Sequence, residues 1–298
     1  MLPTVPAKTL LTRCKAPGSW FGIDYNMNLY RGCCHGCLYC DSRSTCYGIE
    51  DFGQVRVKEN ALRLLRDELR RKVRTGVVGT GSMSDPYNPF EKQLQLTRHA
   101  LELLDAFGFG AAIATKSSLV LRDSDLLKEI AGHSPVVVKI TITTPDDRLS
   151  RRLEPGVSPS SQRFAALEGL SREGIFCGVL LMPVLPFVED DPQAVRQLLQ
   201  RAADCGARFV YPYFGVTMRD GQREFFLQRL EEAFPGQGLA QRYQQRYGGQ
   251  YSCLSPRARE LGQCFTEECR RLGLLSRMGE IISASRMGYA PQQLSLFD

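Results

Sequence analysis

Short apolar runs alternate with amphipathic helical stretches along most of this chain, and this alternation limits the possible fold more than any other feature. Apolar runs of strand length lie near 22–29 and at 77–80, 109–115, 136–143, 176–182 and 208–213. Helix-period patterns lie between them, at 58–74, 94–106, 124–131, 160–172 and 192–204. Strands that alternate with helices pair in parallel through right-handed crossovers. We therefore predict an α/β fold, a partial (β/α)6 TIM-like barrel over residues 1–215.

The alternation stops after residue 215, and the remaining sequence is helical in character, rich in arginine and interrupted by glycine. Between 219 and 286 there are 11 arginines and no lysine against eight acidic residues, a net charge of +3 in a chain whose total is +6. We predict that residues 216–298 form a mainly helical, Arg-rich C-terminal extension packed against the barrel.

Composition excludes several classes of protein. The 298 residues include 11 cysteines, an odd number, and the chain is long enough to bury a core without disulfides. Its first residues lack an apolar run of signal-peptide length, and no stretch approaches the ~20 apolar residues that span a bilayer. We expect a cytoplasmic protein with no membrane contact. No glycine-rich phosphate motif follows a predicted strand, which disfavours dinucleotide or P-loop chemistry.

The segment 30–47, YRGCCHGCLYCDSRSTCY, follows the first predicted strand and carries a cluster of cysteines. A structural zinc site needs two C-x2-C pairs, and only Cys37 and Cys40 supply one. A ferredoxin-type pattern starts at Cys34 but meets Ser44 where its fourth cysteine belongs. The third interpretation takes Cys33, Cys37 and Cys40, with C-x3-C-x2-C spacing.

With that spacing and the aromatic Tyr39 before the last cysteine, the sequence resembles the radical S-adenosylmethionine (SAM) enzymes. The resemblance implies that Cys33, Cys37 and Cys40 hold three irons of a [4Fe–4S] cluster and leave the fourth iron to SAM. It also implies an electron donor such as flavodoxin or ferredoxin. An electron from the cluster cleaves SAM to a 5′-deoxyadenosyl radical, which abstracts hydrogen from a substrate. The cofactor supplies this chemistry, and the protein supplies position and exclusion of water.

Further motifs resemble the spore photoproduct lyase branch of this superfamily over roughly residues 20–215. They occur in the expected order along the chain: SMSDPYNPFE at 82–91, LTR at 96–98, TKS at 115–117, LRD at 121–123, KITITT at 139–144, RLEP at 152–155 and a GI…G…MPVLP stretch from 174 to 186.

This resemblance implies specific roles for individual side chains. A serine after strand two, a lysine after strand three and a hydroxyl residue on strand four contact SAM in the lyase, and here they are Ser84, Lys116 and Thr141. Together with Tyr39 these are the predicted cofactor-binding residues. The candidate catalytic residues, Asp85 and Tyr87, lie in the motif after strand two. Groups at the carboxyl ends of strands are where a β/α barrel builds its site.

One position departs from the lyase pattern. The lyase returns a hydrogen atom to its product from a cysteine two residues before that serine, and here the position is Ser82, whose O–H bond is too strong for this role. Cys34, Cys46 and Tyr87 are candidate substitutes. The departure argues against repair of spore photoproduct itself and indicates a different substrate or a different way of ending the radical.

Two features of the extension favour DNA as substrate. In the segment 242–247, RYQQRY, arginines could contact phosphates while Tyr243 and Tyr247 stack on bases. The alternative is a solvated helix whose tyrosines pack on the barrel. The tail Gln293, Leu294, Ser295, Leu296 and Phe297 resembles the peptide that bacterial repair proteins insert into the sliding clamp; the alternative is a tail that closes the barrel.

We therefore predict a radical SAM enzyme that acts on DNA, in repair or modification of a base. An RNA, peptide or small-molecule substrate is the alternative within the class, and a non-catalytic zinc-stapled nucleic-acid-binding protein is the alternative outside it. Cys253, Cys264 and Cys269 leave a second, auxiliary cluster open, with Cys14 or Cys46 as a fourth ligand.

Overall fold

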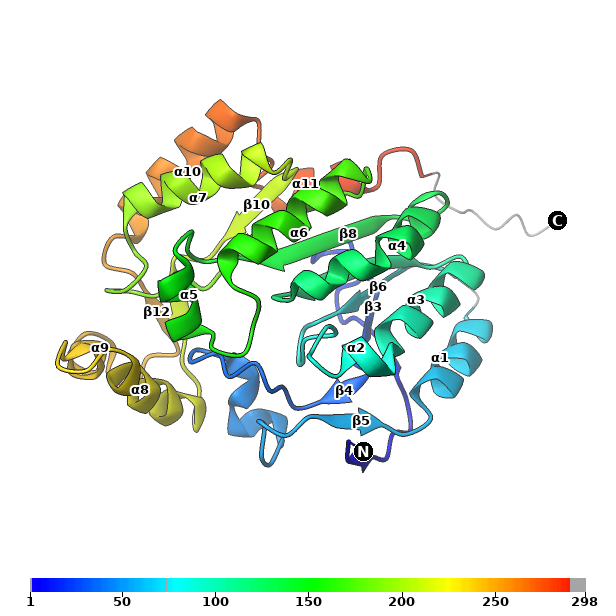
Figure 1. The fold of residues 1–298 in the computed structure, drawn as a ribbon, viewed down its shortest axis with the longest axis horizontal. Helices are drawn as coiled ribbons and strands as arrows, with labels where there is room; N and C mark the ends of the chain where they lie inside the picture. The colour runs from blue at the N-terminus through cyan, green and yellow to red at the C-terminus, as the bar shows by residue number, and fades with distance from the viewer. Residues whose placement is uncertain (1, 73, 290–298) are drawn as a thin grey trace.

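A computed structural model describes residues 2–72 and 74–289 and shows an α/β architecture around one twisted sheet (Figure 1). The sheet has seven strands in the order β10-β9-β8-β7-β6-β3-β2. Neighbouring strands are parallel from β3 to β10, and β2 joins the edge antiparallel to β3. The bounds are β2 (Leu11–Arg13), β3 (Tyr25–Met27), β6 (Val77–Thr80), β7 (Gly110–Thr115), β8 (Val136–Thr141), β9 (Cys177–Leu181) and β10 (Phe209–Pro212).

Helices follow these strands in chain order and cover the outer face of the sheet. They are α1 (Ala61–Arg70), α2 (Glu91–Leu94), α3 (Leu96–Ala106), α4 (Ser124–Ala131), α5 (Asp147–Leu153), α6 (Ser160–Arg172) and α7 (Pro192–Asp204). Helix α7 begins at a proline, whose fixed φ suits the first turn, and Asp191 accepts hydrogen bonds from the backbone N–H groups of Gln193 and Ala194 at 3.3 and 3.2 Å. Six parallel strands with crossover helices confirm the predicted partial (β/α)6 barrel.

The chain departs from the predicted elements mainly around the cysteine segment. A small three-stranded sheet, β1 (Thr4–Val5), β5 (Arg56–Lys58) and β4 (Tyr30–Arg31), frames that segment. Short 3-10 turns, η1 (Asp41–Arg43) and η2 (Thr45–Tyr47), form its second half, and a third, η3 (Ser118–Asp123), follows β7. Helix α5 was not predicted because its sequence, DRLSRRL, has too few apolar positions to show a helical period.

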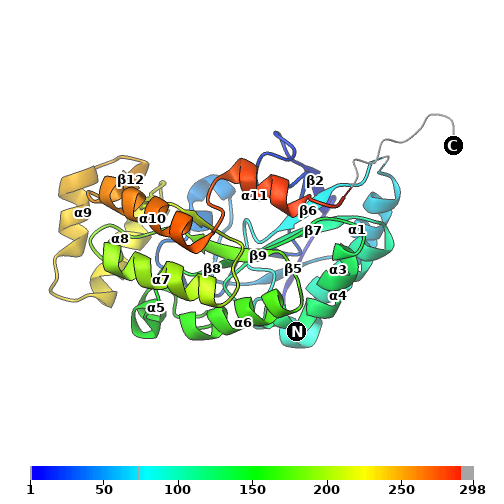
Figure 2. The same ribbon diagram turned by 90° about the horizontal axis from the view of Figure 1, so that it is seen from above.

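The inner face of the sheet holds a separate apolar cluster that closes the barrel at the amino ends of its strands. Phe21, Ile23, Val77, Val137 and Phe209 are buried there. Helix α11 (Met278–Ser285) covers this cluster, and Figure 2 shows it on the opposite face of the sheet from α6 and α7. The other end of the barrel, at the carboxyl ends of the strands, is therefore the end that stays open to ligands.

Lys139 of β8 is buried with this inner cluster, at 1% exposure. Its Nζ lies 4.9 Å from the centroid of the Phe21 ring. Burial lowers the pKa of the Lys139 ammonium to about 7. Because the unfolded chain then binds more protons from about pH 7 up to the usual lysine pKa, folding stability must rise with pH across that window.

We expect Lys139→Met to raise the free energy of unfolding at pH 7 by on the order of 3 kcal/mol, because the substitution removes a buried ammonium. The increase of stability between pH 7 and 10 should flatten in this variant. Urea unfolding at several pH values measures both effects. Lys128→Met, at an exposed position on α4, is the control and should change neither. Equal pH dependence of Lys139→Met and the wild type would contradict this expectation.

The C-terminal extension contains an antiparallel pair of strands as well as the predicted helices. After β10 the chain forms β11 (Gly215–Thr217), α8 (Gln222–Ala233), α9 (Leu239–Tyr247), β12 (Ser252–Leu254), α10 (Ala258–Leu272) and α11. Strands β11 and β12 pair antiparallel although α8 and α9 separate them in sequence. Helix α10 packs along α7 (Figures 1 and 2).

The segment 242–247 forms most of α9, and its tyrosines face inward. Tyr243 and Tyr247 are buried in a second apolar cluster with Phe226. Their hydroxyls donate to the backbone carbonyls of Pro186 and Leu254, at 2.9 and 2.6 Å. The prediction that these rings stack on bases is therefore wrong, and the packing alternative is correct.

Two further features bear on membrane and partner predictions. Within the described residues, no helix combines the length and apolarity needed to cross a membrane. The tail Gln293–Phe297, predicted to bind a sliding clamp, lies outside the described residues.

Candidate active site

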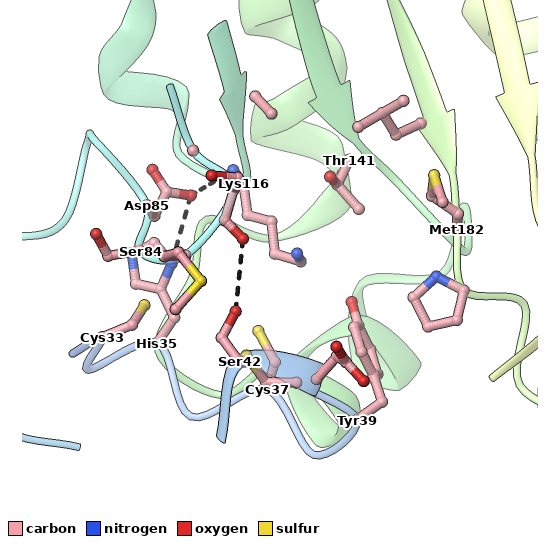
Figure 3. Close-up of a pocket in the computed structure, with 18 of the residues that line it drawn as sticks. Cys33, His35, Cys37, Tyr39, Ser42, Ser84, Asp85, Lys116, Thr141 and Met182 are labelled. Atoms are coloured by element: carbon pink, nitrogen blue, oxygen red, sulfur yellow. Dashed lines mark hydrogen bonds and ion pairs between the residues drawn. The ribbon is translucent and has the colours of Figure 1, made fainter. Parts of the chain in front are cut away.

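A pocket of about 340 Å³ opens at the carboxyl ends of the barrel strands. One wall is the loop after β4, which carries the clustered cysteines, and the opposite wall is made by the ends of β7, β8 and β9 (Figure 3). The residues predicted from the sequence that line it are Cys33, Cys37, Tyr39, Cys40, Ser82, Ser84, Asp85, Lys116 and Thr141. Tertiary structure thus gathers residues from three separate loops and the end of β8 into one cavity.

Cys33, Cys37 and Cys40 line the same side of the pocket, all with free thiols. Burial raises the pKa of the Cys37 thiol, and the neighbouring Lys116 ammonium opposes that rise. Three thiol donors from one eight-residue loop suit a cluster whose irons each take one thiolate. The chemistry of the donor set therefore fits a [4Fe–4S] cluster, with the three cysteines as its ligands.

Asp85 ties three segments of the site together. Its carboxylate accepts hydrogen bonds from the Thr115 hydroxyl at 2.6 Å and from the backbone N–H groups of Lys116 and Tyr87 at 2.7 and 2.9 Å. Oδ2 also lies 3.5 Å from Nδ1 of His35, in the cysteine loop. Asp85 was predicted as a catalytic residue, but these four contacts occupy its oxygens. The geometry supports a positioning role between the cysteine loop and the end of β7.

Lys116 follows β7 and reaches into the pocket toward the cysteine loop (Figure 3). Its Nζ lies 5.6 Å from the centroid of the Tyr39 ring. Burial would lower the pKa of the Lys116 ammonium, but the surrounding Cys37, Glu154, Cys40 and Asp85 raise it above its usual value. Lys116 therefore stays charged and presents a cation to an anionic group bound in the pocket, such as the SAM carboxylate.

A buried network joins the cysteine loop to β8 behind the pocket. The Tyr39 hydroxyl donates to Glu154, which is also paired with the Arg163 guanidinium. Arg163 donates to the carbonyl of Thr141 at 2.7 Å and to the Ser150 hydroxyl at 3.0 Å. Sequence reasoning did not single out Arg163, because one arginine on an amphipathic helix gives no signal that it is buried.

The hydroxyl residues of the pocket are held by nearby backbone. Ser84 donates to the carbonyl of Tyr30 at 3.2 Å, which fixes it beside the start of the cysteine loop. Ser42 donates to the carbonyl of Ser82 at 3.5 Å across the pocket. Thr141 ends β8 with its side chain facing the cavity (Figure 3). Ser84 can therefore accept a hydrogen bond from a ligand that lies between the two walls, and Thr141 faces the same space.

Three predicted hydrogen donors lie outside the pocket lining. Tyr87 is buried in the main core, and this position argues against the catalytic role predicted for it. Cys34 packs partly against the same core, and Cys46 is exposed near Arg219. The structure instead brings to the pocket a phenol that sequence reasoning missed, Tyr213 after β10, whose hydroxyl lies 2.8 Å from the Ser252 hydroxyl.

The candidate ligands of an auxiliary cluster lie on different elements of the described structure. Nowhere in that structure, the cysteine loop included, are three Cys, His, Asp or Glu side chains arranged to hold a single ion. Cys264 and Cys269 are buried on α10, and Cys253 is buried in β12. The sulfhydryls of Cys253 and Cys264 face backbone carbonyls of Gln250 and Pro192.

The C-terminal extension forms the rim of the pocket. Thr217 of β11 lines the pocket and donates to Asp41, directly after Cys40, at 3.1 Å. The Arg219 guanidinium bonds both oxygens of Asp41 at 3.1 Å. It also lies 4.8 Å from the ring centroid of Tyr251 and 5.9 Å from that of Tyr47. These two rings are exposed, at 48% and 36%.

The sequence model of the Radical SAM superfamily matches residues 27–199 of this chain. An uncharacterized protein of Mycobacterium tuberculosis strain H37Rv is 36% identical over 245 residues, which are 80% of this chain and 71% of that protein. The Radical SAM Nalpha-GlyT isomerase of Pseudomonas phage M6 is 27% identical over 185 residues, 61% of this chain and 37% of its own length.

Solved structures of low sequence identity share the fold. Spore photoproduct lyase complexed with dinucleoside spore photoproduct superposes with a TM-score of 0.67 at 17% identity, over 92% of this chain and 80% of the lyase. A variant of that lyase with bound AdoMet gives 0.62 at 16% identity, over 89% and 77%. The methyltransferase TsrM from Kitasatospora setae, with cobalamin and a [4Fe–4S] cluster bound, gives 0.53 at 12% identity, over 88% and 60%.

The family match covers more than half of the chain. The cofactors of the protein are accordingly a [4Fe–4S] cluster and SAM. The three thiols, the Lys116 ammonium and the hydroxyls of one pocket agree with this pair of cofactors. The family match also sets aside the zinc-stapled alternative. The chain belongs to the radical SAM superfamily.

Proposed function

We propose that this enzyme abstracts hydrogen from a nucleotide of DNA, in the repair or modification of a base. The likeness in fold to a lyase solved with a dinucleoside supports this substrate class. The observation that carries the proposal is the rim of the pocket, where exposed aromatic rings flank an arginine.

That rim has the chemistry of a site for an unstacked nucleotide. Bases of a single strand or a flipped nucleotide stack on aromatic faces, while arginine contacts the flanking phosphate. Tyr251 and Tyr47 offer exposed rings, and Arg219 lies between them, held by Asp41 beside the cysteine ligand Cys40. A base on this rim lies next to the mouth of the pocket in which SAM binds.

The chain's own residues prepare the pocket for this chemistry. When bound, the reduced cluster supplies the electron that cleaves SAM to a 5′-deoxyadenosyl radical. Cys33, Cys37 and Cys40 hold the cluster, while Lys116 and Thr141 orient SAM from the opposite wall. The apolar inner cluster under α11 closes the barrel from below, so water reaches the pocket from the rim side.

Ser82 lines the pocket, and the sequence resemblance aligns it with the hydrogen-donating cysteine of the lyase. Among the described residues that line the pocket, the sulfhydryls belong to the cluster ligands Cys33, Cys37 and Cys40. The proposal is therefore a lyase-like enzyme with a different DNA substrate, and it does not extend to repair of spore photoproduct.

Label transfer from DNA tests the proposal directly. Reconstituted protein, reduced with dithionite under anaerobic conditions, is incubated with SAM and with oligonucleotides deuterated at the base or the sugar. We expect deuterium in the 5′-deoxyadenosine formed with one of these substrates. Formation of unlabelled 5′-deoxyadenosine with every DNA, or label transfer from RNA alone, would contradict a DNA substrate.

A variant of the rim provides the second arm of this test. We expect Tyr251→Ala to weaken binding of a single-stranded oligonucleotide roughly tenfold, since one base–aromatic stack contributes about 1–3 kcal/mol. SAM cleavage without DNA should be unchanged. Trp20→Ala is the matched control, because Trp20 is similarly exposed but contacts the inner cluster under the barrel. Equal losses for the two variants would argue against the rim as the nucleotide site.

A further inference from the structure

The cysteine loop rests on the turn that follows α5. The Leu38 N–H donates to the carbonyl of Leu153 at 3.0 Å, and the Gly156 N–H donates to the carbonyl of His35 at 2.9 Å. A Cβ atom on Gly156 would lie 2.8 Å from the carbonyl oxygens of both Cys34 and His35. Glycine is therefore needed for this close backbone contact.

The layer between this loop and solvent is one chain thick. Pro155 and Gly156 are exposed on their outer side, and Pro155 Cγ lies 3.4 Å from the position of a Cβ on Gly36. The ligand Cys37 follows Gly36 directly, Cys33 precedes it by three residues, and both line the pocket on the inner side. Because electron transfer slows steeply with distance, this turn is a short route from the surface to a bound cluster.

The surface around the turn is positively charged. From residue 146 to 159 the exposed charged side chains are Arg148, Arg151 and Arg152 against Asp146, which leaves a net positive charge. Glu154, the acidic residue in this stretch, is buried against Arg163. Asp146 caps α5, and Asp147 accepts hydrogen bonds from Ser161 and lies 3.9 Å from Arg151.

We propose that α5 and the turn 154–156 form the docking surface for an acidic one-electron carrier protein of the flavodoxin or ferredoxin class. The cationic face of α5 complements the negative surface of such a carrier, and complementary charge steers association. Docking there brings the carrier against the thin layer over the cysteine loop, between α6 and α8 (Figure 1). One electron leaves the reduced carrier and enters the cluster, and no bond is made or broken.

This inference rests on the cluster assignment and is independent of the DNA substrate. Its test therefore uses no nucleic acid in the main arm, so that failure of the DNA proposal leaves the result interpretable. The variant is Arg148→Glu/Arg151→Glu. Arg152 is left in place because its guanidinium lies 4.7 Å from the Phe234 ring centroid and contributes to packing.

The measurement is the rate at which reduced flavodoxin reduces the reconstituted protein, followed by stopped-flow absorbance, together with calorimetric binding of oxidised flavodoxin. We expect the double variant to be reduced 10–100-fold more slowly at low ionic strength, with weaker flavodoxin binding. The difference should shrink at 0.5 M salt, where exposed charges are screened. Reduction by dithionite and the visible spectrum of the cluster should match the wild type.

The matched control is Arg259→Glu/Arg270→Glu, the same charge change at exposed positions of α10. It should be reduced by flavodoxin within a factor of about two of the wild type. Equal slowing of both variants would show an effect of net charge and overturn the proposal. So would an unchanged rate in the α5 variant. Loss of oligonucleotide binding in the α5 variant, with normal reduction by flavodoxin, would assign this surface to nucleic acid instead.

Discussion

Replacing Cys37 with alanine is expected to abolish reductive cleavage of SAM. The three thiols of the loop line one pocket, and the loss of one leaves a cluster iron without its protein ligand. Mutating a residue that only hydrogen-bonds a metal ligand lowers metal affinity or activity about 10–100-fold. Loss of the ligand itself should therefore lower SAM cleavage by more than about 100-fold. Iron content, the visible absorbance of the anaerobic protein and the yield of 5′-deoxyadenosine with dithionite measure the effect.

Cys34→Ala is the control for this experiment, because Cys34 is adjacent to a predicted ligand but lies outside the pocket lining. It should keep its iron, its colour and most of its SAM cleavage. Full activity of Cys37→Ala would refute the ligand assignment. Equal loss of iron in both variants would show that the substitutions act by disrupting the loop instead of by removing a ligand.

Replacing Arg163 with methionine should destabilise the fold by about 3–5 kcal/mol, the usual cost of breaking a buried ion pair by removing one partner. Glu154 would keep its charge without a cation, and the carbonyl of Thr141 would lose its donor. Urea unfolding of the metal-free protein at pH 7 measures the loss. In the folded fraction, weaker SAM binding is expected, because Arg163 links the Tyr39 side of the pocket to β8.

Two variants separate the ion pair from general effects on α6. Arg172→Met alters an arginine of the same helix whose side chain is 75% exposed, and it should cost less than about 1 kcal/mol. Arg163→Met combined with Glu154→Leu removes both charges and should recover much of the lost stability. If the double variant is as unstable as the single one, the buried charge is not the cause.

Elements with a clear apolar period were predictable because their pattern is local. The bounds of α4, α6 and α7 match the predicted ranges 124–131, 160–172 and 192–204. The pairing of β11 with β12 was not predictable, because 34 residues separate the two strands and neither has a partner in its own neighbourhood. Helix α5 is short and mostly polar, and it forms against the cysteine loop and α6.

Site residues divide in the same way. The sequence predicted that three polar residues lie at strand ends, namely Ser84, Lys116 and Thr141. The structure brings all three to the pocket. The positioning role of Asp85 could not be predicted from the sequence, because the partners of its carboxylate oxygens come from two other segments. The Arg–Tyr segment of α9 had the composition of a nucleotide site, but packing turned its rings inward.

The sequence by itself determined the fold class and, through its resemblance to a known family, predicted the three cluster ligands. Strand and helix periods act over a few residues, and the three thiols lie within eight residues of one loop. Only the tertiary structure decided which charged and aromatic groups are buried and which meet at the pocket, namely the Glu154–Arg163 pair behind it and the Arg219–Tyr251 rim in front. Both groups depend on the distant cysteine loop, because Tyr39 contacts Glu154 across 115 residues and Asp41 contacts Arg219 across 178, and no local pattern contains such a separation.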